Sequence, residues 1–489
     1  MQMQSIINYF TIILLLCLAQ PCMAQPAELN SVFQPEDLQE DFILFQRILE
    51  QAHGNLYTYN DTIEIKRELS KTYSALDRSM SYPEFYKLLN GALCFINNQQ
   101  TTVSYPSEYL KQLYKLETFF PLHLRLISQK MYCDDRLSVI PVGSEILSIN
   151  GKRFRDIYFD ALTVIPTEGK NKTYAYQELE RAFPFYYTQL YGPIKEYEIS
   201  FTDPVEGGNK TITMAAVSYN EFLQRQNKKQ PQKNAKPFSY TYIDSIRTAV
   251  LTINEVEKKN NKRLKKFLKN NFARLKEKKG QYLILDLRKH GSQNEAIYPL
   301  IFSYLSQRSY KEVNDAQTVG LRIPFKELLT GKIKRQTRAA EKMLIQKFVE
   351  EDSGYFTLNP NMNPVFISEN DAFTGNLYVL ISGNTLNSGV GLCSLLRNEN
   401  KATFIGEETG GNYYGHSGGV MLTYKLPKTG MILRVPKIHF IHYVQNNYFS
   451  EDSGIIPHYT AVITPGNIIE NSDPVMDFNI KLIRLGNVR

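Results

Sequence analysis

A segment near the C-terminal end, residues 377–420, constrains the fold more than any other part of the sequence. Apolar residues at 378–381 predict a strand, and small residues after it predict a tight turn. Apolar positions between 390 and 396 predict a helix, which precedes a second strand over 402–405 and a glycine-rich turn. A strand, a tight turn and a helix present a side chain at a helix N-terminus, where free amides and the dipole stabilise developing negative charge. The segment therefore predicts a turn of the kind that presents a catalytic nucleophile.

The same alternation of strand and helix continues upstream of this segment. Residues 248–253 and 282–287 read as strands, and residues 264–275 and 296–305 read as helices. Alternating elements of this kind are typical of an α/β layered domain, which we place at residues 238–489. A charged stretch at about 323–356 interrupts it as a helical insertion to which the sequence assigns no role.

Helical spacing also dominates the N-terminal part of the chain. Residues 35–52, 63–76 and 83–96 each carry apolar positions three and four apart, and the first begins with a proline. They predict a helical subdomain over residues 30–105. Together with the C-terminal half, this makes the chain a multi-domain α/β protein.

The first 24 residues are expected to be a signal peptide rather than part of the fold. Residues 10–19 are apolar but too short to span a membrane, and small residues follow at 22–24. We therefore expect an exported protein, periplasmic or in the cell envelope, with no transmembrane segment. A lipid anchor at Cys22 stays open. Removing the segment leaves three cysteines, which permit at most one disulfide, and no pattern supports a metal or another cofactor.

Short strands and turns mark the region 115–220. The run 141–151 (PVGSEILSING) resembles the signature of PDZ modules, with a generic β-hairpin as the alternative. PDZ domains bind extended peptides as an added strand. The resemblance thus implies peptide-binding positions at Gly143, Ile146 and Ile149. A polar, proline-containing stretch at 224–237 is expected to be the linker to the α/β domain.

The positive charge of the chain does not by itself indicate a nucleic-acid partner. The net charge is +8, and residues 258–279 alternate basic and apolar residues with helical spacing. A solvated helix face explains this pattern, with an anionic or nucleic-acid surface as the alternative. Because we expect export, we predict no nucleic-acid partner.

The segment 377–420 resembles the catalytic segment of S41 peptidases, the C-terminal-processing or tail-specific proteases. Residues 406–411 (GEETGG) fit the GExTxG motif of that family, and the resemblance extends in order over nearly the whole mature chain. It implies a core of the ClpP/crotonase type. The spacing in the family places the serine nucleophile at Asn387, which cannot form an acyl-enzyme. Ser388 follows, but one residue turns a side chain by about 100° around a helix, and a serine there is expected to cap the helix.

The base positions of the family are also substituted. One branch uses a lysine after GExTxG, and Asn412 stands there. A tricorn-like branch uses an acid and a histidine after the N-terminal helices, and the resemblance aligns Asn98 and Gln100 with them. Neither side chain accepts a proton near pH 7. Residues 410–416 resemble the glycine-rich phrase of the lysine-lacking branch, which places the chain in that branch.

The oxyanion loop of the family, DLRxNxGG, is matched only at its start. Residues 286–288 (DLR) fit, but Ser292 and Gln293 stand in place of the two glycines. Losing one oxyanion donor typically lowers the rate by about 10²–10³. Two histidines are alternative bases for Ser388: His290 in this loop, and His416, for which the sequence shows no acidic partner.

Taken together, the substitutions indicate an exported S41-like pseudopeptidase that binds peptides or protein tails through its PDZ-like module and vestigial cleft. The alternative is an active serine endopeptidase that uses Ser388 with a rearranged His416 or His290. Non-peptide binding and a structural role in an envelope assembly stay open, as do the peptide ligand and the oligomeric state.

Overall fold

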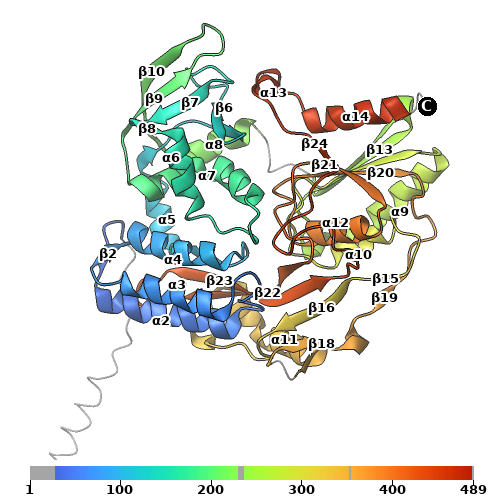
Figure 1. Cartoon of the computed structure of the whole chain (residues 1–489), viewed down its shortest axis with the longest axis horizontal. Coiled ribbons are helices and arrows are strands. Elements are labelled where there is room, and N and C mark those ends of the chain that lie inside the picture. The colour runs from blue at the N-terminus through green and yellow to red at the C-terminus, as the bar shows by residue number, and fades with distance from the viewer. Residues whose placement is uncertain (1–27, 230–235, 352–353, 487–489) are drawn as a thin grey trace, which may run out of the picture.

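The computed structural model describes residues 28–229, 236–351 and 354–486. The expected signal peptide and residues 230–235 of the expected linker lie outside these ranges. Within these ranges, three six-stranded sheets and the helices packed on them build most of the molecule, with three two-stranded sheets beside them (Figure 1). Within the described ranges, no helix combines the length and the apolar character needed to span a bilayer.

The C-terminal half is built on a mostly parallel sheet. Its strands follow the order β12 (Phe238–Ile243), β13 (Thr248–Ile253), β14 (Tyr282–Asp286), β20 (Asn376–Ile381), β21 (Ala402–Gly406) and β24 (Tyr459–Thr460). Only β12 runs antiparallel to its neighbour. The prediction of an α/β layered core is confirmed.

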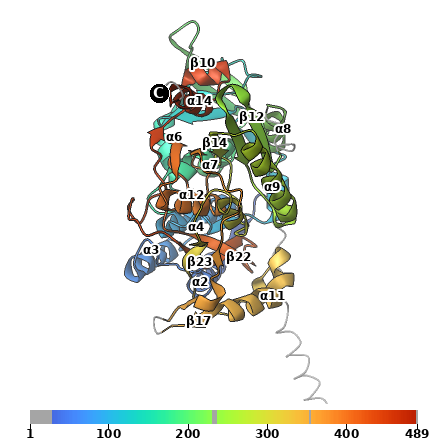
Figure 2. The same cartoon turned by 90° about the vertical axis from the view of Figure 1, so that its right-hand side faces the viewer.

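Helices cover both faces of this sheet. One face packs against α9 (Asn261–Glu277), α10 (Ile297–Phe302) and α12 (Ser388–Asn398), and the other packs against α14 (Pro474–Gly486). Figure 2 shows α9 beside β12 along one side of the molecule. The basic residues of α9 point outward while Leu264 and Leu268 are buried, as the solvated-face interpretation expects. The central strands β14 and β20 are rich in buried aliphatic residues, which is typical of parallel sheets.

A second sheet forms the PDZ-like region. Its strands are β5 (Leu124–Ile127), β6 (Lys130–Cys133), β7 (Glu145–Ile149), β8 (Lys152–Arg153), β9 (Glu196–Thr202) and β10 (Asn209–Ala215). The helix expected at 154–162 is present as α6 (Phe154–Leu162). A second helix, α7 (Thr173–Tyr191), was not expected in a region of strands and turns. It contains Pro184 and is kinked at Ala182.

The three N-terminal helices lie where the sequence predicts them. They are α2 (Pro35–Ala52), α3 (Thr62–Ser74) and α4 (Tyr82–Ile96). Capping boxes begin α3 and α4: Asp61 pairs with Glu64, and Ser81 pairs with Glu84. The helices do not enclose a core of their own.

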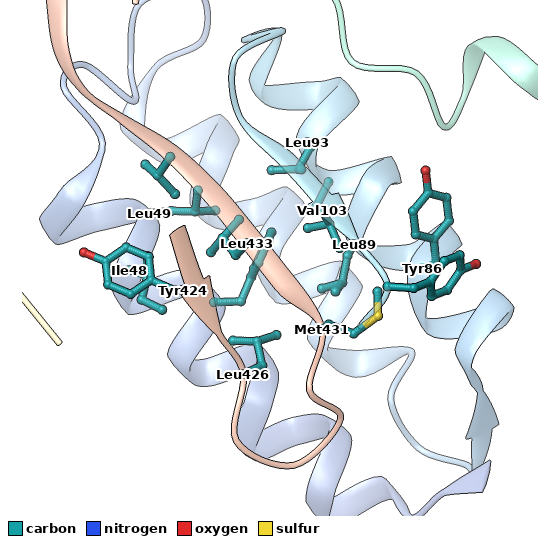
Figure 3. Packing of buried hydrophobic residues seen from close by; sticks show 14 of the residues in the cluster. Ile48, Leu49, Tyr86, Leu89, Leu93, Val103, Tyr424, Leu426, Met431 and Leu433 are labelled. Carbon is teal, nitrogen blue, oxygen red and sulfur yellow. The ribbon is translucent and has the colours of Figure 1, made fainter. Parts of the chain in front are cut away.

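Instead, the N-terminal helices pack on a long hairpin from the C-terminal half, β22 (Gly415–Lys425) and β23 (Ile432–His442). Figure 3 shows Leu49 and Leu89 of the helices beside Leu433 of the hairpin. Next to α4, β3 (Thr102–Ser104) pairs with β23. The region 30–105 therefore shares one hydrophobic core with residues more than 300 positions away.

The hairpin belongs to a third sheet that includes the expected insertion. This sheet orders β17 (Phe348–Glu350), β18 (Phe356–Leu358), β16 (Val313–Thr318), β23 and β22. About half of the insertion is α11 (Gly331–Lys347), which buries Leu344 in the shared core. Short elements complete the fold: β1 (Val32–Phe33), β2 (Met80–Ser81), α5 (Ser107–Leu113), β4 (Glu117–Phe119), β11 (Val217–Ser218), α8 (Tyr219–Lys229), β15 (Tyr310–Lys311), β19 (Val365–Phe366) and α13 (Pro465–Glu470). Because α8 extends to residue 229, it covers the start of the expected linker.

Candidate functional site

Three loops meet at the carboxyl edge of the parallel sheet. They leave β14, β20 and β21 at residues 287–296, 382–387 and 407–414. Hydrogen bonds tie them together: the Thr385 hydroxyl donates to the Leu287 carbonyl at 2.9 Å, and the Leu386 amide donates to the His290 carbonyl at 3.0 Å. In open α/β sheets this edge is where ligands bind. The three loops hold five of the positions that the sequence singled out, namely His290, Ser292, Gln293, Asn387 and Asn412.

Asn387 occupies a strained turn at the start of α12. Its backbone has φ 47° and ψ −121°, a conformation that few residues other than glycine adopt. The side chain is 3% exposed, and its Nδ2 donates to the Gly291 carbonyl at 2.9 Å. Within the described ranges, its Oδ1 finds no hydrogen-bond donor. The expected strand–turn–helix geometry is thus present, and Asn387 lies in its turn, directly before the first residue of α12.

Ser388 is fully buried beside this turn and is bound to the oxyanion loop. Its backbone amide and its hydroxyl both donate to the Ser292 carbonyl, at 3.2 and 2.8 Å. An oxyanion needs N–H donors aimed at it, whereas a carbonyl oxygen faces Ser388 here. Ser292 lies in the loop position that the family resemblance assigns to a glycine. Its own hydroxyl donates to the Val256 carbonyl at 2.8 Å.

His290 is the histidine that the structure brings to Ser388. Its Nδ1 lies 2.7 Å from the Asn254 carbonyl, which only accepts, so Nδ1 carries the proton. Its unprotonated Nε2 then faces the Ser388 Oγ at 3.1 Å. Burial lowers the pKa of His290 to about 4, although the Asn254 carbonyl and the charge of Glu295 oppose this shift. His290 is therefore neutral at pH 7 and competes with the Ser292 carbonyl for one hydroxyl proton.

The two glutamines that the sequence resemblance aligns with the base and the oxyanion loop bond to each other. Gln293 Nε2 donates to Gln100 Oε1. Within the described ranges, no donor reaches Gln293 Oε1, although that atom is buried. Asn98 Oδ1 accepts from the Gln100 amide at 3.2 Å, and its Nδ2 donates to Ser417 Oγ at 3.0 Å. Hydrogen bonds thus connect positions 98, 100 and 293, and Asn387 is bonded to Gly291 in the same loop as Gln293.

Asn412 is bonded to backbone groups at both ends of its side-chain amide. Its Nδ2 donates to the Glu451 carbonyl at 2.6 Å, and its Oδ1 accepts from the Tyr414 amide at 2.7 Å. Both ends of its amide group are thereby used to hold the glycine-rich turn in place.

His416 does have an acidic partner, which the sequence did not reveal. Its Nε2 lies 2.9 Å from Glu295 Oε2, and its Nδ1 lies 2.8 Å from His442 Nε2. His442 Nδ1 faces the Tyr413 carbonyl at 2.8 Å, so His442 must accept at Nε2. His416 consequently donates from both nitrogens and is an imidazolium paired with a carboxylate.

The electrostatics agree with this assignment. Burial alone lowers the pKa of His416, but the charge and hydrogen bond of Glu295, with Glu168 and Glu312, outweigh burial and raise it. The pKa of His442 falls through burial and through the charge of His416. Because its nitrogens are engaged in these two bonds, His416 has no free lone pair with which to deprotonate Ser388. No sequence spacing links positions 295, 416 and 442.

Glu168 also lies close to the site, contributed by the PDZ-like region. It is 2% exposed and accepts from the Tyr59 hydroxyl at 2.9 Å and from the Gln99 amide at 3.3 Å. Burial raises the pKa of Glu168 to about 7, while these two hydrogen bonds and the charge of His416 oppose the shift. Within the described ranges, no group of three or more acidic, histidine or cysteine side chains is arranged to hold a metal ion.

The three positions expected to bind peptide in the PDZ-like region are largely enclosed. Ile146 and Ile149 are buried in the sheet core, and their strand β7 lies between β6 and β9. A β-carbon on Gly143, whose φ is 89°, would lie 2.7 Å from the Ile469 side chain of α13. These placements argue against direct contact with a peptide.

The free edges of this sheet are β5 and β10. On β5, the outward amide of Leu126 already donates to Glu180 of α7 at 3.1 Å. Glu180 in turn is 2.6 Å from Arg125. An added strand would therefore meet β10 more easily than β5.

Comparison with known proteins agrees with this architecture. Residues 247–461 match the model of Peptidase family S41. No curated protein sequence matches the chain.

Among solved structures, a point mutant of CPAF superposes with a TM-score of 0.63 at 13% identity, covering 92% of this chain and 97% of that one. Mature CPAF complexed with lactacystin gives 0.60 at 12% identity, with 92% and 98% covered. The photosystem II D1 C-terminal processing protease gives 0.41 at 13% identity, with 88% and 93% covered. At such identities the likeness to CPAF shows a shared fold. Residues 247–461 are therefore similar to Peptidase family S41, and the chain shares its multi-domain α/β fold with CPAF.

Proposed function

We propose that this S41 peptidase homologue is exported and binds peptides or protein tails without cleaving them. One observation carries the proposal: the strained turn at the carboxyl edge holds Asn387, which has no proton to lose near neutral pH and cannot form an acyl-enzyme. A turn that could present a nucleophile at a helix N-terminus thus carries an amide side chain.

The surroundings of Asn387 support the same reading. Gln100 and Gln293 offer no basic nitrogen, and they are already bonded to each other. The carbonyl of Ser292 faces the position where a peptidase needs oxyanion donors. A single substitution would therefore not be expected to restore full activity.

Binding is supported by the unused acceptors at the site. Asn387 Oδ1 and Gln293 Oε1 are buried and lack a hydrogen-bond donor within the described ranges. Buried polar atoms are normally paired, and an extended peptide presents a row of backbone N–H donors. Both acceptors are closed off from solvent in the unbound fold, so we infer that peptide amides complete these hydrogen bonds when the loops around Asn387 and Gln293 open.

A binding experiment tests this directly. Fluorescently labelled, unfolded casein would be titrated with the mature protein and with Asn387→Leu, which keeps the volume but removes the acceptor. We expect weaker binding by about tenfold, since a lost hydrogen bond is worth about 1 kcal/mol or more. Asn270→Leu, the same change on the exposed face of α9, is the matched control. Equal binding by both variants would contradict the proposed surface.

A hydrolysis experiment tests the loss of activity. The wild type should not cleave casein, whereas Asn387→Ser combined with Gln100→His supplies a nucleophile and a base in the positions that the family uses. Cleavage by the double variant alone would show a cleft that is otherwise competent. Export is tested separately, by finding whether the protein isolated from the cell envelope lacks residues 1–24.

One observation favours a second candidate function, an active serine hydrolase. The neutral Nε2 of His290 lies 3.1 Å from the Ser388 hydroxyl, within the range of a nucleophile and its base. A fluorophosphonate probe separates the two functions, because it labels only an activated serine. Labelling of the wild type that Ser388→Ala and His290→Gln both abolish would refute the pseudopeptidase proposal.

A further inference from the structure

The backbone at Asn387 has a geometry that matters for a reaction other than peptide cleavage. We propose that Asn387 is a site of spontaneous deamidation, in which the backbone nitrogen of Ser388 attacks the side-chain amide carbon of Asn387. The proposal concerns the stability of one covalent bond and is independent of whether the protein binds peptides.

The attack forms a five-membered imide ring, and one ring bond is the Cα–C bond of Asn387. Ring closure needs a torsion near zero between Cβ and the Ser388 nitrogen about that bond. In an L-residue Cβ stands about 120° from the residue's own nitrogen around this axis, because the substituents of Cα are tetrahedral. A ψ of −121° therefore makes Cβ of Asn387 almost eclipse the Ser388 nitrogen, so that the torsion between them about the Cα–C bond is close to zero. The fold already holds the torsion that an unfolded chain must find by chance.

Fewer hydrogen bonds hold the side-chain amide of Asn387 than hold the other buried asparagines of the site. Asn387 is held only through Nδ2, which donates to Gly291, while Oδ1 lacks a donor within the described ranges. Asn98 and Asn412 are also buried asparagines, but each is bonded at both Oδ1 and Nδ2. Ser388 adds only a small side chain beside the reacting atoms.

The reaction balances without any reagent except water. The Ser388 nitrogen forms a bond to Cγ of Asn387, the bond from Cγ to Nδ2 breaks, and Nδ2 leaves as ammonia with the proton released from the Ser388 amide. That amide gives up its 3.2 Å hydrogen bond to the Ser292 carbonyl. Water then opens the imide at either carbonyl, which leaves aspartate or isoaspartate at position 387. The product places a carboxylate in the strained turn at the start of α12.

The test compares the folded protein with the same chain unfolded in guanidinium chloride, both kept at mildly alkaline pH. Trypsin releases residues 348–397 in one peptide, because Lys347 precedes it and Arg397 ends it. The product is heavier by about 1 Da, and the imide intermediate is lighter than the starting peptide by about 17 Da. Fragment masses distinguish Asn387 from Asn384 in the same peptide.

We expect position 387 to react at least about tenfold faster in the folded protein than in the unfolded chain, because the torsion is prearranged. Asn150 is the internal control: it precedes Gly151 in an exposed turn, but its Oδ1 accepts from the Glu198 amide at 2.7 Å. It should react more slowly when folded. An equal or slower reaction at position 387 in the folded protein would overturn the proposal. Asn387→Gln, whose longer side chain would need a larger ring, should show no change at this position.

Discussion

Glu168 gives the protein a pH-dependent stability whose size follows from its burial. The carboxyl lies inside the molecule with the Tyr59 hydroxyl and the Gln99 amide as its hydrogen-bond donors. Burial raises its pKa from 4.5 to about 7 despite those two bonds. A difference of this size between folded and unfolded states corresponds to about 3 kcal/mol.

The sign follows from the direction of the shift. Below pH 4.5 the carboxyl is protonated in both states, and its contribution to stability is fully present. As the pH rises through about 7, the folded state must ionise a buried group, and the contribution is lost. Glu168→Gln cannot ionise. Its free energy of unfolding, relative to the wild type, should therefore rise by about 3 kcal/mol between pH 4.5 and 8.

Urea unfolding followed by circular dichroism at several pH values measures this difference. Taking the variant relative to the wild type cancels the titration of every other group that the change leaves untouched. Glu196→Gln, the same change at an exposed position of β9, is the matched control. A difference that stays constant within about 1 kcal/mol over the pH range, or one that falls with pH, would refute the reasoning.

Two further perturbations follow from the site. Glu295→Gln should lower the pKa of His416, because burial then acts with less opposition, and an NMR titration of the imidazole would detect it. The His416–Glu295 pair stabilises the fold most at pH values below 6.5, the ordinary pKa of histidine, because the folded-state pKa is raised. The variant should therefore lose most stability under acidic conditions. A larger loss of stability at alkaline pH would contradict the assignment. Gly389→Ala should lower the melting temperature by several degrees, since the new β-carbon would lie 2.3 Å from the His290 carbonyl oxygen. Gly91→Ala, in a helix with open space around the new β-carbon, should instead stabilise the folded state by about 0.5–1 kcal/mol. Similar effects of the two substitutions on the melting temperature would contradict the prediction, because they would mean that the backbone at Gly389 moves away from the His290 carbonyl.

Local patterns predicted the elements whose apolar spacing is regular. The helix at 35–52 and the strand at 248–253 lie in the structure with the predicted bounds. The hairpin β22–β23 was not predicted, because its first strand begins with the glycine-rich phrase that resembled a turn. Helix α7 was missed since aromatic residues and Pro184 obscure its period.

The site was predictable only where the spacing of a family could be carried over. That spacing singled out positions 100, 293 and 387, and the structure bonds Gln100 to Gln293 and Asn387 to Gly291 of the same loop. Glu168, Glu295 and His442 were not found, because each reaches the site from a separate segment and no fixed interval in the sequence connects them. Partners separated by more than 100 residues become visible only when the topology is known.

The core that the N-terminal helices share with the β22–β23 hairpin has a consequence for how the chain folds. The Asp41 carboxylate of α2 accepts from the amides of Lys428 and Thr429, 387 and 388 residues away. Contacts of such long range form late, after their loop-closure entropy is overcome. During synthesis, the apolar face of α2–α4 therefore stays exposed until the β22–β23 hairpin that covers it has been made. A ribosome that stops before residue 415 would release a polypeptide exposing that face, which is the kind of surface that chaperones and proteases recognise.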